Sequence, residues 1–186
     1  MKLYIKYMVS IRCKMIVQAT LNELGLQSGI VELGEVEIAE NLTSEEYNIL
    51  RTKLLTSGLE LMEDRKAILI EKIKNVIINM VHYAHELPRT KNSIYISEKL
   101  NYDYTYLANL FSEATGLTIE HYIIAHKIER AKELLLYDEI NLTQIAYQLN
   151  YSSVAHLSSQ FKKVTGLTPS FFKQLKYKKR IALENV

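Results

Sequence analysis

The chain has 186 residues, of which 48% are apolar and 24% are charged, a composition typical of a soluble globular protein with one large or two small domains. No apolar run approaches the roughly 20 residues that a membrane-spanning helix needs, and the N-terminus lacks the apolar core of a signal peptide. With Cys13 as the single cysteine, these properties predict a cytoplasmic protein without an internal disulfide.

The net charge of +2 conceals a difference between two parts of the chain. Residues 1–63 carry 6 Lys or Arg and 9 Asp or Glu, whereas residues 64–186 carry 17 and 12. This modest excess of basic residues in the second part agrees with a surface that binds phosphate groups.

The chain opens with an α+β pattern. Alternating apolar residues over 2–9 indicate a strand, and helical spacing over 13–24 indicates a helix. Two runs on either side of Gly34, residues 29–33 and 35–39, have acidic residues at alternate positions, as a half-exposed hairpin would.

A second helix and a last strand complete this pattern. Ser44 is the expected N-cap, Gly58 is the expected end of the helix, and residues 59–62 supply the strand. The order βαββαβ predicts a ferredoxin-like domain over residues 1–63.

Residues 64–87 predict a connecting helix that Asp64 caps and Pro88 ends. Its apolar residues recur at heptad-like spacing, at Ile70, Ile73, Ile77, Met80 and Ala84. The short pattern favours a helix that packs on the core of the next domain, with a coiled-coil dimer seam as the alternative. His82 and His85 resemble half of a metal site, but with no third ligand nearby we interpret them as surface or packing residues.

Residues 88–180 contain one pattern twice. Residues 96–102 (ISEKLNY) return as 145–151 (IAYQLNY), and residues 111–118 (FSEATGLT) return as 161–168 (FKKVTGLT). The offset grows from 49 to 50 residues, so one copy has gained a residue. Each copy predicts two helices around a tight turn, which is the outline of a helix-turn-helix, and two such units indicate a protein that reads DNA.

The second part of the chain is predicted to be helical throughout. Gly116 and Gly166 stand where helices must end, and Asn101 and Asn150 stand in the tight turns, where Asn tolerates a left-handed backbone. The predicted helices cover residues 92–100, 103–114, 119–136, 142–149, 152–164 and 169 to about 178. A basic run at Lys176, Lys178, Lys179 and Arg180 precedes a tail over 181–186.

Residues 93–174 resemble the AraC/XylS family of bacterial transcription regulators. The resemblance lies in residues 121–135 (HYIIAHKIERAKELL), similar to that family's central linker helix, and in Ile145–Ala146, Phe161–Lys162 and Gly166–Pro169. It implies an all-α domain with two helix-turn-helix units joined by a rigid helix, each unit placing its second helix in a major groove.

The resemblance also implies which side chains meet the DNA. Base contacts are expected from the exposed N-terminal parts of the two recognition helices, at Tyr104, Thr105, Ala108, Asn109, Ser153, Val154, Ala155, His156 and Ser159. Neither helix contains Arg, so we expect Asn109 to contact adenine, apolar contacts with thymine methyl groups, and reliance on DNA shape. Phosphate contacts or solvated surface charges are the two interpretations of Lys127, Arg130, Lys162 and Lys163.

The first domain resembles, more distantly, a heavy-metal-associated domain, whose metal loop has the pattern Met-x-Cys-x-x-Cys. Here the loop runs from Met8 to Cys13, and Ser10 replaces the first cysteine, so the two-thiolate site that soft metals need is absent. Three interpretations stay open: a structural or dimerisation module, a Cys13 metal site shared between subunits, or a lone redox-sensitive thiol.

These patterns predict a transcription regulator that binds double-stranded DNA, without a cofactor and without catalytic residues. A homodimer and a contact with RNA polymerase are left open, and no membrane partner is expected. The alternatives are a metal- or thiol-responsive sensor that acts through Cys13, and a protein-interaction module that has lost its DNA specificity.

Overall fold

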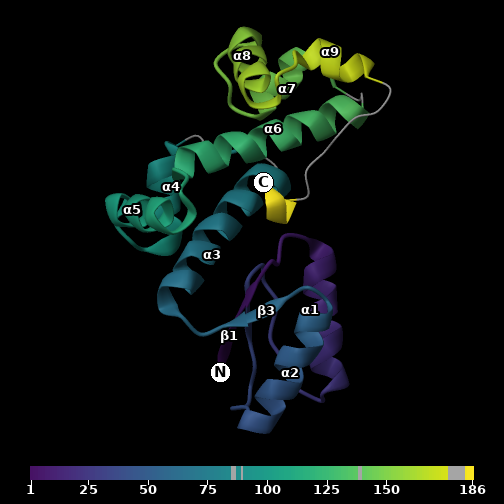
Figure 1. The fold of residues 1–186 in the computed structure, drawn as a ribbon, viewed down its shortest axis with the longest axis vertical. Helices are drawn as coiled ribbons and strands as arrows, with labels where there is room; N and C mark the ends of the chain where they lie inside the picture. Colours follow the sequence, from purple (N-terminus) through teal and green to yellow (C-terminus); the bar gives the residue numbers. More distant parts are fainter. Residues whose placement is uncertain (85–86, 89, 138–139, 176–182) are drawn as a thin grey trace. The chain divides into compact units, whose positions relative to one another are not determined.

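The computed structural model describes residues 1–84, 87–88, 90–137, 140–175 and 183–186, apart from the side chain of Glu184. The chain divides into two compact units, residues 1–75 and 76–186, which Figure 1 colours along the sequence. The division falls within a helix, inside the segment predicted to connect the domains. No helix among the described residues is long and apolar enough to cross a membrane.

The first unit is built on a small antiparallel sheet. Its elements are β1 (Lys2–Lys6), α1 (Ile11–Glu23), β2 (Glu35–Glu37), α2 (Ser44–Thr56), β3 (Glu60–Met62) and most of α3 (Arg65–Ile78). The strand order is β2-β1-β3, with Leu3 opposite Val36 and Ile5 opposite Leu61. The first strand in the sequence is therefore the central strand of the sheet.

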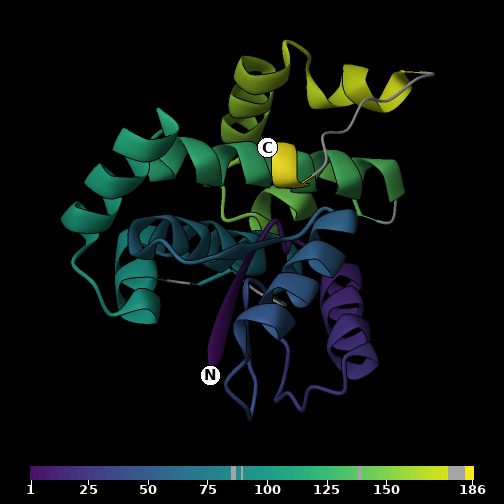
Figure 2. The ribbon, with the colours of Figure 1, turned by 60° about the horizontal axis from the view of Figure 1, so that its bottom comes forward.

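The core of this unit follows from the alternation along β1. Leu3 and Ile5 are buried, whereas Lys2, Tyr4 and Lys6 alternate with them on the more exposed face. The helices α1 and α2 lie side by side (Figure 2). They bury apolar residues at helical spacing, namely Val17, Leu21, Leu50 and Leu54.

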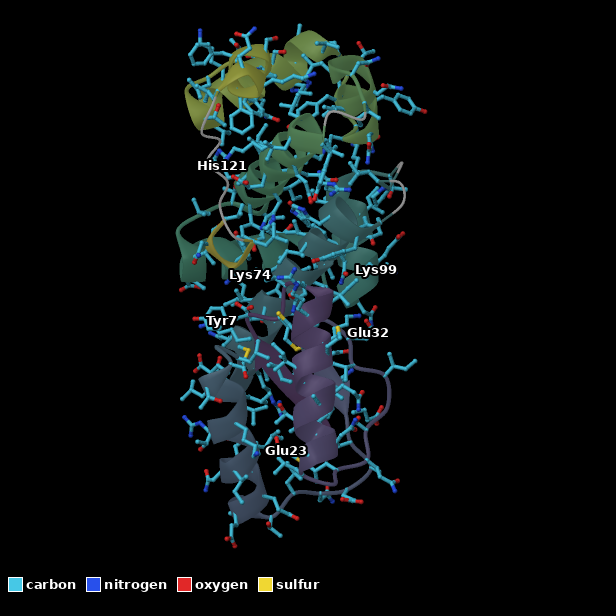
Figure 3. The ribbon with its side chains drawn as sticks, turned by 90° about the vertical axis from the view of Figure 1, so that its right-hand side faces the viewer. Tyr7, Glu23, Glu32, Lys74, Lys99 and His121 are labelled. Carbon is cyan, nitrogen blue, oxygen red and sulfur yellow. The ribbon has the colours of Figure 1, made fainter. Side chains whose placement is uncertain are left out.

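Ion pairs form both between and within the elements of this unit. Lys14 of α1 pairs with Glu32 at 2.8 Å, and Lys74 pairs with Glu71 within α3 at 2.7 Å; Glu32 and Lys74 are labelled in Figure 3. The exposed pair of Lys14 contributes little to stability, typically about 0–1 kcal/mol, whereas Glu71 is buried. Apolar burial therefore dominates the stability of this unit.

The predicted strand over 29–33 is not formed as a ladder, so the sheet has three strands among the described residues, and the full βαββαβ order is not met. Two isolated bridges, Ser28 to Ile38 and Glu32 to Glu35, are all that pair this segment with β2 and its extension. Val31 and Leu33 of this segment are buried, whereas Ile30 is exposed and Gly29 has no side chain to pack, which weakens its pairing as a regular strand.

The N-cap of α2 is Thr43, one residue before the predicted Ser44. The Thr43 hydroxyl accepts a hydrogen bond from the Glu46 amide at 3.3 Å, and the Glu46 carboxylate accepts one from the Thr43 amide at 2.8 Å. This reciprocal capping box needs Glu at the third helical position, which favours Thr43 over Ser44.

The connecting helix is shorter than predicted. Asp64 accepts a hydrogen bond from the Ala67 amide at 2.7 Å, as expected of a cap, but α3 ends at Ile78. It continues as one π-helical turn, η1 (Asn79–Tyr83), which buries Met80 and contacts a helix of the second unit's core. That contact agrees with a helix packed on the following domain. Ala84 is exposed, and His85 lies outside the described residues.

The second unit is helical throughout its described residues. Its helices are α4 (Asn92–Leu100), α5 (Tyr104–Thr115), α6 (Ile119–Tyr137), α7 (Leu142–Gln148), α8 (Val154–Thr165), α9 (Pro169–Gln174) and the short η2 (Leu183–Asn185). The predicted bounds agree to within two residues for α4 to α8, whereas the basic run at 176–180 lies outside the described residues. The pairs α4–α5 and α7–α8 pack at the two ends of α6 (Figure 1).

Each pair forms its own small core against α6. Around α5 the buried residues are Leu107, Leu110, Phe111, Ile119, Tyr122 and Ile123, and around α8 they include Ile128, Ala131, Ile145, Leu149, Leu157 and Phe161. Leu107, Leu110 and Phe111 of α5, and Leu157 and Phe161 of α8, are thus buried in these cores. The long helix α6 serves as the shared support of both modules.

Candidate nucleic-acid interface

The two copies of the repeat make the same tight turn before their second helix. Asn101 and Asn150 both adopt left-handed backbone conformations, with φ values of 57° and 52°, as predicted. In the second copy the Asn150 amide also donates a hydrogen bond to the carbonyl of Pro88 at 3.2 Å. That bond holds the second turn to the segment that enters the first module.

The second helix of each copy begins with an equivalent cap. The Asp103 carboxylate accepts a hydrogen bond from the Tyr106 amide at 3.1 Å, and the Ser153 hydroxyl accepts one from the His156 amide at 3.1 Å. The residue gained by the second copy lies between the left-handed turn and this cap. Both caps hold the N-terminal parts of α5 and α8, where the predicted base contacts lie.

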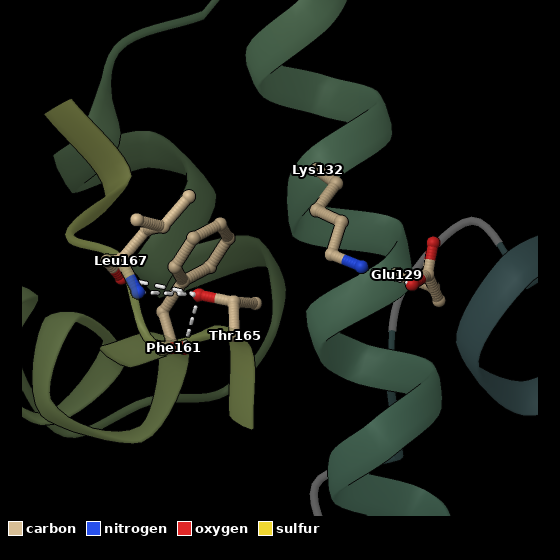
Figure 4. A network of polar contacts seen from close by, with 5 residues as sticks. All are labelled: Glu129, Lys132, Phe161, Thr165 and Leu167. Atoms are coloured by element: carbon tan, nitrogen blue, oxygen red, sulfur yellow. Dashed lines mark hydrogen bonds and ion pairs between the residues drawn. The ribbon is translucent and has the colours of Figure 1, made fainter. Parts of the chain in front are cut away.

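The same helices also end alike (Figure 4). The Thr165 hydroxyl donates to the carbonyl of Phe161 at 2.8 Å and accepts from the amide of Leu167 at 3.1 Å. Thr115 makes the equivalent bonds in the first copy, at 2.7 and 3.2 Å. Gly116 and Gly166 follow with φ values of 73° and 78°, so only a residue without a side chain fits this stop without strain.

The structure exposes most of the side chains that were predicted to contact bases. Six are exposed, namely Thr105, Asn109, Ser153, Ala155, His156 and Ser159, whereas Tyr104, Ala108 and Val154 are half-buried. Ser153 is exposed, but its hydroxyl is already engaged in the cap of α8. Burial also raises the pKa of Tyr104, with a smaller effect of the Glu120 carboxylate, so this phenol stays neutral.

An exposed aromatic pair in the first copy was missed by sequence reasoning. Tyr102 and Tyr106 stack with their ring centroids 5.9 Å apart and their planes inclined by 24°. They are 49% and 48% exposed, on the turn and on α5. Their spacing of four residues was the available signal, but Tyr102 lies before the helix begins. In the second copy Tyr151 and His156 meet edge to face instead, at 5.2 Å.

The four predicted phosphate contacts differ in their surroundings. Lys162 and Lys163 are exposed on the last turn of α8. Arg130 pairs with Glu133 at 2.6 Å. The ammonium group of Lys127 lies over the ring of Tyr151 at 5.3 Å, and burial lowers its pKa.

Lys127 also lines a polar hollow of about 640 Å³ between the two modules, with Lys91, Asn92, Glu120 and Asn150 among the other lining residues. Its lining thus combines Lys127 of α6, Lys91 at the N-cap of α4 and the Glu120 carboxylate. The exposed pair on α8 and the hollow are two separate candidate places for phosphate groups.

A pair of buried histidines lies under the first module. Nε2 of His82 is 3.1 Å from Nδ1 of His126, and the Tyr122 ring meets His126 edge to face at 4.4 Å. Burial, with a smaller effect of His82, lowers the pKa of His126 to about 3. The pair could not be predicted from a sequence pattern, because 44 residues separate its members.

The loop that was compared with a metal site holds Cys13 and Ser10 together. The sulfur of Cys13 lies 3.3 Å from the Ser10 hydroxyl and 3.8 Å from the carbonyl of Tyr7. Within the described ranges, no group of three or more His, Cys, Asp or Glu side chains is arranged to hold a metal ion.

Comparison with known proteins places the repeat in a known domain family. Residues 96–174 match the family model described as a helix-turn-helix domain. The chain is 27% identical over 106 residues to YtdP, an HTH-type transcriptional regulator of Bacillus subtilis (strain 168). The aligned part makes up 57% of this chain and 14% of the relative. The chain is 30% identical over 79 residues to the Msm operon regulatory protein of Streptococcus mutans, covering 42% and 28%. The chain therefore spans less than a third of either relative.

A solved structure shares the fold of the second unit. The C-terminal domain of AraT, a response regulator from Geobacillus stearothermophilus, aligns with a TM-score of 0.51 and 23% identity over 64% of this chain and 92% of that domain. Residues 96–174 thus match a helix-turn-helix domain, and the relatives to which the chain is similar include a transcriptional regulator and an operon regulatory protein.

Proposed function

We propose that the chain is a sequence-specific regulator of transcription, of the AraC type, which binds double-stranded DNA through residues 88–180. The observation that carries this proposal is the matched pair of modules. Each module caps its second helix in the same way and exposes the first turn of that helix, and both modules pack on α6. A single helix-turn-helix outline would be a weaker signal, because many helical proteins contain one by chance.

The dimensions of α6 support this function. Its 19 residues correspond to about 28 Å of helix, close to the roughly 34 Å of one DNA turn. Two recognition helices held by such a support suit two neighbouring segments of the major groove. The side chains for direct readout are Thr105, Asn109, Ala155, His156 and Ser159, which are polar or small and contain no Arg.

The first unit is proposed as a reduced ferredoxin-like domain that serves regulation or assembly. Residues 28–32 run antiparallel to residues 35–38 through two isolated bridges, at the position where the second strand of that fold would lie. The central place of β1, between β2 and β3, also agrees with that fold. Its role is separate from the DNA-binding role of residues 88–180.

The test is a selection of random duplexes by the purified full-length chain at moderate salt, followed by sequencing. We expect a motif with two half-sites about one helical turn apart. Asn109→Ala should weaken binding to the selected duplex by about 1–3 kcal/mol and relax the sequence preference in one half-site only.

Gln148→Ala is the matched control, because Gln148 is exposed on α7 rather than on a recognition helix. It should leave affinity and motif unchanged. Folded protein that enriches no motif, or whose binding is insensitive to salt, would contradict the proposal, because phosphate contacts make DNA binding salt-dependent.

A further inference from the structure

The first unit contains a pocket that the DNA-binding role does not use. It has a volume of about 650 Å³ and is lined wholly by residues of this unit, from β1, β3, the start of α2 and the start of α3. Clefts of this size are typical of sites for small organic molecules. Its lining has two chemically different parts.

One part of the lining is aromatic and apolar. Tyr4 of β1, Tyr47 of α2 and Met62 of β3 contribute to it, with Leu42 and Ile68 beside them. Tyr47, Met62 and Ile68 are all half-buried, so their surfaces are partly accessible. Such surfaces favour a ligand with an apolar or aromatic body.

The other part of the lining is cationic. Arg51 of α2 and Arg65 of α3 both line the pocket and are exposed, and neither has an ion-pair partner among the described residues. Burial, with a smaller effect of the Glu63 carboxylate, raises the pKa of the Tyr47 phenol, which therefore stays neutral. The ammonium group of Lys2 is paired with Glu35, at 2.7 Å.

The guanidinium groups of Arg51 and Arg65 are therefore the positive charges of the pocket that are still available to a ligand. Guanidinium groups bind carboxylates through two parallel hydrogen bonds, which a compact ammonium group cannot do. We propose that this pocket binds a small organic carboxylate with an aromatic or aliphatic body, its carboxylate on Arg51 and Arg65 and its body against Tyr4, Tyr47 and Met62. This site goes beyond the DNA-binding function and does not depend on it.

The methionines give a direct readout. The chain has five, at positions 1, 8, 15, 62 and 80. Met62 lines the pocket, whereas Met15 is 65% exposed on α1 and does not line it, and Met8 is fully buried. In full-length protein with ¹³C-labelled methionine methyl groups, the probes are 4-phenylbutyrate, indole-3-acetate and octanoate, each beside its primary amide, with inorganic phosphate as a further probe.

We expect at least one carboxylate to shift the Met62 signal saturably below about 1 mM, without moving the Met15 signal. The matching amide should bind at least tenfold more weakly. Arg51→Gln and Arg65→Gln should each weaken carboxylate binding at least tenfold, while Arg12→Gln, an exposed change on α1 outside the pocket, should have no effect.

The proposal is overturned if no carboxylate moves Met62, if amides or inorganic phosphate bind as tightly as the carboxylates, or if both pocket variants bind as well as the native chain. An unchanged Met8 signal verifies that each variant is folded. DNA binding is measured separately on the same samples, so failure of the pocket and failure of the DNA-binding proposal are distinguishable.

Discussion

Nε2 of His82 lies 3.1 Å from Nδ1 of His126, and this contact between the π-helical turn η1 and the first half of α6 is buried on both sides. The other ring nitrogen of His126, Nε2, has no hydrogen-bond partner among the described residues. An imidazole placed in this way is stable in its neutral form and is costly to protonate.

Stability should therefore fall in acid. His126 has a folded-state pKa of about 3 against an ordinary value of 6.5, so the unfolded chain binds more protons below pH 6.5. The free energy of unfolding is therefore unaffected by this group above pH 6.5. It decreases as the pH falls from 6.5 toward 3, by up to about 1.4 kcal/mol per pH unit. Urea unfolding between pH 7.5 and 4.5 measures it. The double variant His82→Leu/His126→Leu should show a flatter pH dependence, and an equal slope in both proteins would contradict this assignment.

The buried phenol of Tyr151 offers a stabilising change. Burial raises its pKa to about 12, and its hydroxyl has no hydrogen-bond partner in the described part of the chain. Removal of an unsatisfied buried hydroxyl relieves a penalty of about 1–3 kcal/mol, so Tyr151→Phe should raise the free energy of unfolding. Tyr102→Phe at the equivalent exposed position should change it by less than about 0.5 kcal/mol. A destabilised Tyr151→Phe variant would show that the hydroxyl is satisfied in solution.

Glu129 and Lys132 form an ion pair on α6 that is almost wholly buried (Figure 4). Lys132→Met leaves the Glu129 carboxylate buried without its cation, which should cost about 3–5 kcal/mol. The double change Glu129→Leu/Lys132→Leu should recover most of that loss. Arg130→Gln, which breaks a partly exposed pair with Glu133, should cost no more than about 1 kcal/mol. Thermal and urea unfolding of the three variants compare the two pairs; a similar loss from Lys132→Met and Arg130→Gln would argue against a buried pair.

The two left-handed Asn residues should respond differently to Gly. Glycine adopts this conformation without strain, so Asn101→Gly should be neutral or stabilising by up to about 1 kcal/mol. Asn150→Gly gains the same relief but loses the hydrogen bond to the Pro88 carbonyl, worth about 1 kcal/mol, and should be neutral at best. Urea unfolding measures both. Identical effects would mean that the bond to Pro88 contributes nothing.

The salt dependence of DNA binding tests the exposed phosphate candidates on α8. Lys162→Gln removes an exposed charge on α8 and should lower the slope of log affinity against log salt by about 1, without altering the selected motif. Lys66→Gln in the first unit is the matched control and should leave the slope unchanged. Binding measured by fluorescence anisotropy at several salt concentrations gives both slopes. If Lys162→Gln instead changed the motif, Lys162 would be a base contact.

The second unit could be predicted closely because its signals are local. Gly116, Gly166, Asn101 and Asn150 each mark a backbone conformation that few residues adopt, and the repetition doubled every signal. The first unit was harder, because strand pairing depends on partners far along the chain. Residues 29–33 carry the alternation of a strand, yet their pairing is reduced to isolated bridges.

Contacts across long separations could not be predicted at all. The sequence shows His82 beside His85, whereas the structure pairs His82 with His126. Likewise, Arg51 and Arg65 have no common pattern in the sequence, yet both line the same pocket. The predicted DNA contacts at Thr105 and Asn109 stay predictions, since exposure permits a contact without establishing one.

One residue is gained between Asn150 and the cap at Ser153, and the exposure of the neighbouring tyrosine differs between the two copies. Tyr102 lies on the surface, 49% exposed, whereas its counterpart Tyr151 is turned into the core, 9% exposed. With this one added residue, the two modules are no longer alike at their exposed surfaces. Because its two modules are unlike, a single molecule would bind a DNA site in one orientation. It would therefore distinguish upstream from downstream without a partner.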